Sequence, residues 1–177
     1  MHWLTTSKGL YTFDGYRFTP QTKPAIALLY TLSLQPDDVH ILLGGANGLF
    51  CYNKQTGQTC KIPGTKATEL RAIVNVPTMS GKPQILVGGH EGLFLYQTNK
   101  LRLLSKTPKD IYCLYSSPRG VYVGTLHGLY IYAHDRCTRL SIQGLTPKDG
   151  AEAISSIKAD EATGKLWLGT FRGLYAF

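Results

Sequence analysis

One eleven-residue pattern occurs five times in the 177-residue chain, and it constrains the fold more than any other feature. Each copy starts with a short apolar segment, usually continues through Gly-Thr or Gly-Gly and two variable residues, and then reads Gly-Leu-aromatic. The copies occupy residues 3–13, 42–52, 86–96, 122–132 and 167–177. The glycine of Gly-Leu falls at positions 9, 48, 92, 128 and 173, at intervals of 39, 44, 36 and 45 residues. Four-stranded propeller blades have repeats of this length.

Each copy has the pattern of a β-hairpin whose two faces are both apolar. The Gly before each leucine suits a backbone with positive φ at a tight turn. In the second strand of each hairpin, side chains alternate between the faces, so the leucines point one way and the aromatic residues the other. The leucines are Leu10, Leu49, Leu93, Leu129 and Leu174. Because both faces must be covered, we expect an all-β fold of stacked blades rather than a single two-layer sandwich.

Additional strands flank each hairpin and complete the blades, with turn residues such as Asp14-Gly15 and Thr163-Gly164 between them. We expect inner strands at residues 28–34, 72–76, 111–115 and 154–159, and outer strands at residues 16–19, 58–62, 101–105 and 138–142. The first blade then lacks an inner strand and the last lacks an outer one. The sequence therefore predicts one propeller fragment over residues 1–177, an incomplete arc of about five partial or full blades cut from something longer.

A strained small ring and a dimer that joins two arcs are alternatives to this open arc. In an open arc the terminal blades expose apolar faces and unpaired strand edges, so self-association, such as a homodimer, is expected. In a longer protein the remaining blades would cover the same faces.

Composition and charge exclude several classes of protein. The longest apolar run, residues 25–30, is far too short to cross a bilayer, and the N-terminus lacks the features of a secretory signal. The net charge is +8, but the basic residues are scattered and no nucleic-acid recognition motif is present. We therefore expect no membrane segment in this chain and no nucleic-acid partner, and the positive charge favours an anionic ligand.

The last copy and the residues before it carry a resemblance to a known family. The segment Leu166-Trp167-Leu168-Gly169-Thr170, followed by Gly173-Leu174-Tyr175 and preceded by Ile154-Ser155-Ser156-Ile157, resembles the two-component-regulator propeller repeat. Thr5 and the Gly-Gly pairs at 44–45 and 88–89 depart from this pattern. Such repeats form the periplasmic sensor domain of hybrid two-component system histidine kinases of the Bacteroidetes type. The resemblance implies a periplasmic location and the sensing of a carbohydrate, with signal transduction through a kinase outside this chain.

The turns within the hairpins, here called the hairpin turns, vary most between copies and share one end of a propeller with the connections between blades. A polar and partly aromatic set of side chains on a fixed frame suits sugar binding, although turns are also polar simply because they are solvated. The candidate ligand-binding residues are Lys8, Asn47, His90, Glu91, His127, Phe171 and Arg172. The connections add Lys66, Lys109, Asp110 and Lys148, so an oligosaccharide or other small ligand of acidic character is favoured.

The sequence shows no metal, cofactor or catalytic signature. The five histidines lack metal-ligand spacing, and the four cysteines form no Cys-x-x-Cys. Cys51 and Cys60 flank a turn and are candidates for a cross-strand disulfide in an oxidising periplasm, whereas Cys113 and Cys137 are expected to lie too far apart. Without a nucleophile motif or an evident carboxylate pair, we expect a binding protein and not an enzyme. The alternatives are a protein-interaction scaffold and, less favoured, a propeller lyase or hydrolase.

Overall fold

The computed structural model describes residues 1–21, 26, 28–35, 37–64, 69–78, 81, 83–143, 152–160 and 162–177, and within them it consists of five small antiparallel sheets. The first sheet holds β1 (His2–Thr6), β2 (Gly9–Phe13) and β3 (Phe18–Pro20). The second holds β4 (Leu29–Leu34), β5 (His40–Gly45), β6 (Gly48–Asn53) and β7 (Thr59–Lys61). The third holds β8 (Leu70–Val76), β9 (Gln84–Gly89), β10 (Gly92–Gln97) and β11 (Lys100–Leu103). The fourth holds β12 (Ile111–Ser117), β13 (Gly120–Thr125), β14 (Gly128–Ala133) and β15 (Arg136–Leu140), and the fifth holds β16 (Ile154–Ala159), β17 (Leu166–Thr170) and β18 (Gly173–Ala176).

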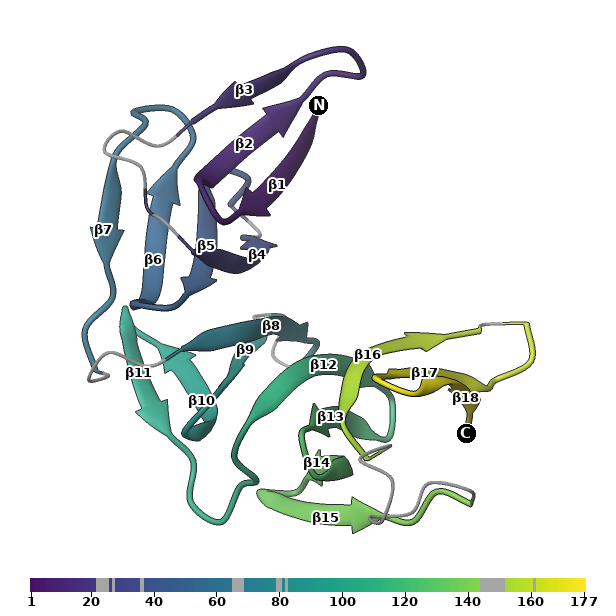
Figure 1. Cartoon of the computed structure of the whole chain (residues 1–177). Coiled ribbons are helices and arrows are strands. Elements are labelled where there is room, and N and C mark those ends of the chain that lie inside the picture. Colours follow the sequence, from purple (N-terminus) through teal and green to yellow (C-terminus); the bar gives the residue numbers. More distant parts are fainter. Residues whose placement is uncertain are drawn as a thin grey trace.

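In every sheet the strands pair in chain order, so each sheet is a meander with the topology of a propeller blade. The predicted hairpins are confirmed in all five sheets, and the first and last sheets have three strands each, as expected. Strands β4, β8, β12 and β16 lie along the inside of the arc, and β7, β11 and β15 lie along its outside (Figure 1). No helix in the described ranges is both long and apolar enough to span a membrane.

The outer strands begin at different residues from those predicted, because of the turns that precede them. The side chain of Asp14 accepts hydrogen bonds from the backbone amides of Tyr16 and Arg17, which holds both residues in the turn, so β3 starts only at Phe18. His134 and Asp135 both have positive φ and complete a two-residue turn, so β15 starts at Arg136, two residues earlier than expected.

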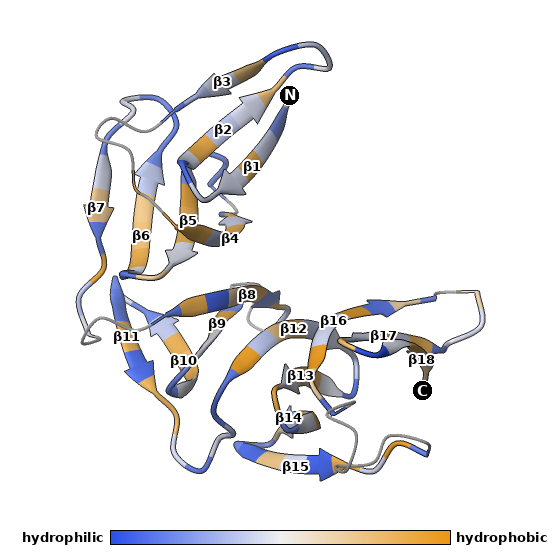
Figure 2. Ribbon diagram, viewed as in Figure 1, coloured by the Kyte–Doolittle hydropathy of each residue, from blue (hydrophilic) through white to orange (hydrophobic). Residues whose placement is uncertain are grey.

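The hydrophobic core lies between the sheets, as the two apolar faces of each hairpin require. In one such cluster Leu42 and Leu49 of the second sheet pack against Val87 and Phe94 of the third. The same arrangement recurs at the other three interfaces between neighbouring sheets. Figure 2 shows the matching hydropathy, with apolar residues along the strands and hydrophilic residues at many turns and on the outer strands β11 and β15.

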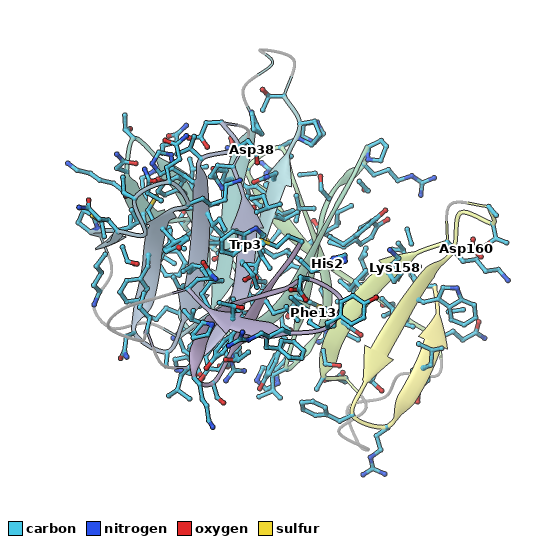
Figure 3. The ribbon with its side chains drawn as sticks, turned by 90° about the horizontal axis from the view of Figure 1, so that it is seen from above. His2, Trp3, Phe13, Asp38, Lys158 and Asp160 are labelled. Atoms are coloured by element: carbon cyan, nitrogen blue, oxygen red, sulfur yellow. The ribbon has the colours of Figure 1, made fainter. Side chains whose placement is uncertain are left out.

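The arc is open, because each sheet packs on its neighbours along the chain and the first and last sheets lie at opposite ends (Figure 1). Seen from above, the last sheet, which carries Lys158, lies at one margin of the molecule (Figure 3). The consequence is visible in the five equivalent leucines. Leu10, Leu49, Leu93 and Leu129 are fully buried, whereas Leu174, on the open face of the last sheet, is 67% exposed.

Candidate functional site

The hairpin turns are tied to the connections between blades by a repeating set of backbone hydrogen bonds. The amides of Ala46, His90 and Leu126 donate to the carbonyl oxygens of Leu28, Glu69 and Asp110, each at 3.0 Å. Leu28 and Asp110 in turn donate to carbonyl oxygens in the preceding blade's turn, those of Ser7 and His90. The described turns and connections therefore lie together at one end of the blades, which we call the rim.

In the second and third hairpins, the second glycine of each Gly-Gly pair lies directly against the backbone of the connection. A Cβ at Gly45 would lie 2.6 Å from the carbonyl oxygen of Leu28, and one at Gly89 would lie 2.4 Å from that of Glu69. Both distances are too short for a carbon atom, so at these two positions the backbone of the connection occupies the space of a side chain. The departure from Gly-Thr has a structural cause in the packing of the rim.

The candidate residues predicted from the hairpin turns are all exposed on this rim. They are Lys8, Asn47, His90, Glu91, His127, Phe171 and Arg172. Of the connection residues, Lys109 is exposed and Asp110 is half-buried, while Lys66 and Lys148 lie outside the described residues. The structure brings two of these candidates together: His90 Nδ1 lies 2.5 Å from Asp110 Oδ1, which links the third hairpin turn to the connection into the fourth blade.

A second set of residues at the rim was missed by the sequence analysis. Each inner strand is paired irregularly near its start, with one extra residue between Leu29 and Thr31, Leu70 and Ala72, Ile111 and Cys113, or Ile154 and Ser156. Such a β-bulge leaves the extra residue outside the ladder and re-aims its side chain. The four bulged residues are Tyr30, Arg71, Tyr112 and Ser155.

Two bulged residues of successive blades, Arg71 and Tyr112, are in direct contact, and other residues of the rim extend this contact. The guanidinium carbon of Arg71 lies 4.3 Å from the centre of the Tyr112 ring, and its Nη2 lies 2.8 Å from Glu69 Oε2. The Tyr112 ring meets Phe171 edge-on at 6.1 Å between ring centres. Burial, followed by a hydrogen bond to Glu69, raises the pKa of Tyr30. We call the four bulged residues together with Glu69 and Phe171 the bulge row: Tyr30, Glu69, Arg71, Tyr112, Ser155 and Phe171.

A sequence signal for the bulges exists, although it was not used. The inner strands place apolar residues three apart, as in Leu70 and Ile73 or Ile111 and Leu114. In a regular strand, residues three apart point to opposite faces, so this spacing on a strand with one buried side indicates an inserted residue. The residue directly after the first apolar position is the bulged one.

The opposite end of the blades carries two open clefts between neighbouring sheets. One has a volume of about 620 Å³ and lies between the second and third sheets, where Asp37, Leu42 and Tyr96 are among its lining residues. The other, about 560 Å³, lies between the third and fourth sheets. Because the two occupy equivalent places, they follow from the way consecutive blades diverge and do not single out a site.

Cys51 and Cys60 also line the first cleft and are register partners on β6 and β7. Both are free thiols in this structure, so their disulfide stays a prediction. Burial, followed by the neighbouring Cys60, raises the pKa of Cys51. Cys113 and Cys137 lie on the innermost and outermost strands of the fourth sheet, and burial raises their pKa to about 12 and about 11. No group of three or more His, Cys, Asp or Glu residues suited to a metal ion occurs in the described part of the chain.

Comparison with solved structures identifies the architecture. The chain is similar to the extracellular domain of BT4673 from B. thetaiotaomicron, with a TM-score of 0.78, 24% sequence identity and 98% of this chain covered. A second structure of that extracellular domain, described as part of a hybrid two component system, gives a TM-score of 0.74 at 21% identity over 99% of this chain. The chain has the fold of these domains. No family model and no curated protein sequence matches it.

An ancestral GH74 enzyme shares the fold more distantly, with a TM-score of 0.71 and 15% identity over 94% of this chain. The chain spans about a quarter of the length of each of these proteins, covering 25%, 24% and 25% of them. At such identities the likeness concerns the fold, and this fold is the one that the resemblance of the repeat implies.

Proposed function

We propose that this chain is a ligand-sensing propeller segment of the extracytoplasmic, periplasmic sensor region of a hybrid two-component system histidine kinase. The observation that carries the proposal is the match of nearly the whole chain to the extracellular domains of BT4673, together with the repeat resemblance. The kinase would lie elsewhere in a longer protein, since the chain spans about a quarter of its neighbours.

The ligand we propose is an oligosaccharide bound at the rim. Polar and aromatic side chains are exposed there on a backbone fixed by hydrogen bonds between turns and connections. Such a preformed surface with a few convergent polar groups is what small-ligand sites require. The net charge of +8 draws acidic sugars toward the surface, and Lys8, Lys109 and Arg172 contribute exposed positive charge at the rim itself.

Binding would act on the kinase through a difference in affinity between two arrangements of blades or subunits. A ligand shifts such an equilibrium only by as much as it prefers one arrangement. The rim suits this role because Leu28 and Asp110, each in a connection, are bonded to the turns of two neighbouring blades.

A protein-interaction scaffold is the second candidate function. The exposed apolar side chains of Trp167 and Leu174 on the last sheet favour it, because exposed apolar surface commonly marks a protein contact. A propeller lyase or hydrolase is the third candidate, and the fold of the ancestral GH74 enzyme is the observation in its favour.

A glycan-array screen followed by calorimetry on the purified chain tests the proposal. Saturable binding of an oligosaccharide that leaves the saccharide intact supports the sensor. Release of shortened saccharide products would instead support the propeller lyase or hydrolase. If no saccharide binds but a purified protein partner binds saturably, the protein-interaction scaffold replaces the sensor as the proposed function.

A further inference from the structure

We propose that the bulge row is the surface that contacts the sugar, and that it binds the uncharged pyranose rings of a neutral oligosaccharide. This inference rests on the proposed function and specifies its ligand and its contact residues.

The recurrence of the bulge is the first step. A β-bulge interrupts the hydrogen-bond ladder, and bulges are enriched next to functional sites, where they re-aim a side chain. Here the irregularity falls at the same place in four inner strands, directly after a residue that is at most 3% exposed. The buried residue anchors the strand, and in the third blade the bulge turns the side chain of Arg71 toward its counterpart in the next blade, Tyr112.

The exposed aromatic rings of the row are the second step. Phe171 is 65% exposed and Tyr30 is 42% exposed, so each presents apolar surface to solvent. The face of an aromatic ring carries negative potential, which attracts the weakly positive C–H groups on the face of a pyranose ring. Tyr112 has a different role, because Arg71 lies over its ring, and it supports both Arg71 and Phe171.

The charges of the row are the third step. The positive charge of Arg71 is balanced by Glu69 at 2.8 Å, and both side chains remain partly exposed at 27% and 34%. Asp110, which occupies the position of Glu69 in the next blade, is paired with His90. An acidic sugar would meet these two carboxylates, whereas a neutral sugar can donate hydroxyl hydrogen bonds to Glu69 and accept them from Arg71. The exposed Lys8, Lys109 and Arg172 lie on the rim outside the row, whereas the charges inside the row are paired. The row itself therefore favours a neutral ring, although the whole chain attracts anions.

The extent of the row is the fourth step. The four bulged residues lie on β4, β8, β12 and β16, which follow one another in chain order along the inside of the arc (Figure 1). Glu69 directly precedes β8, and Phe171 lies in the turn between β17 and β18. Tyr30 and Phe171 stand at its two ends and belong to different blades. A ligand that contacts both rings must therefore be an oligosaccharide and not a single sugar.

The test is calorimetric titration of the whole chain with neutral and acidic oligosaccharides of equal length. Cellohexaose and xylohexaose are the neutral probes, and hexagalacturonate is the acidic one. We expect a neutral probe to bind about tenfold or more tightly than the acidic probe. Phe171→Ala and Tyr30→Ala should each weaken binding of the neutral probe by about tenfold, the size of effect expected for an aromatic contact residue.

Matched controls separate the row from general effects of mutation. Tyr16→Ala removes a ring that is 98% exposed in the outer turn of the first blade, and Arg119→Ala removes an exposed arginine at the far end of the blades. Both should leave binding within about twofold. Arg71→Lys keeps the positive charge but loses the planar group over Tyr112, so it should weaken binding while the melting temperature of the chain is retained.

The outcomes distinguish the two proposals. If cellohexaose or xylohexaose binds and the Phe171 and Tyr30 variants bind it as tightly as the native chain, the bulge row is not the contact surface, while the sensing function stands. A preference for hexagalacturonate would overturn the neutral ligand. If none of the three probes and no saccharide of the array binds, the proposed function fails, and this inference fails with it.

Discussion

Substitution of the equivalent leucines tests the order in which the blades pack. Leu93 is fully buried between the third and fourth sheets, where it packs in one cluster with Leu86, Ile111 and Val123. Leu93→Ala should lower the free energy of unfolding by about 3 kcal/mol, since buried leucines typically lose 2–5 kcal/mol on truncation. For a chain of this size that loss corresponds to a fall in melting temperature of roughly 6–12 °C.

Leu174→Ala is the matched control, because Leu174 occupies the same repeat position but is 67% exposed. Its effect on the free energy of unfolding should stay within about 0.5 kcal/mol, as for most surface substitutions. Thermal unfolding followed by circular dichroism, at protein concentrations where light scattering gives a monomer, measures both. Equal falls in melting temperature for Leu93→Ala and Leu174→Ala would refute the conclusion that the outer face of the last sheet is open to solvent. A fall for Leu174→Ala that appears only as concentration rises would identify a second copy as the cover of that face.

Three further predictions concern separate parts of the chain. Oxidised glutathione should link Cys51 to Cys60, which face each other across β6 and β7, so a thiol count should fall from four to two; four remaining thiols would exclude the bridge. The hydrogen bond from His40 and then the backbone amides of His40 and Val39 lower the pKa of Asp37 to about 2, against about 3.9 unfolded. Ionised Asp37 therefore stabilises the fold above about pH 4, and this contribution is lost as the pH falls toward 2; a carboxyl carbon NMR titration with a midpoint near 3.9 would contradict it. Gly89→Ala should lower the melting temperature more than Gly169→Ala. The new Cβ at position 89 would meet the backbone oxygen of Glu69 at 2.4 Å, whereas the one at position 169 would meet only the movable hydroxyl of Ser156. A larger fall for Gly169→Ala would show that the rim is not held as described.

The hairpins were predictable because their signals are local. Alternation along each strand and the glycine at the tight turn act within eleven residues, and no distant contact is needed to interpret them. The burial of Leu93 and its equivalents also followed, since a hairpin with two apolar faces must be covered on both. The exposure of Leu174 follows from the same reasoning for an open arc.

The outer strands and the bulge row were less accessible to sequence reasoning. His134 and Asp135 adopt positive φ without glycine, so nothing in composition marks the turn that starts β15. Tyr112 is an ordinary residue of the inner strand expected at 111–115, and Arg71 falls one residue before the strand expected at 72–76. Their contact depends on two blades being placed side by side. Such contacts between repeats are set by packing, which a single strand pattern does not specify.

The hydrogen bonds of Asp110 have a mechanical consequence. Its amide holds the carbonyl of His90 in one blade, while its carbonyl receives the amide of Leu126 in the next. The backbone of Asp110 thus joins the third and fourth blades directly. A small rotation forced on one of these two blades is therefore expected to pull on the other through this shared segment.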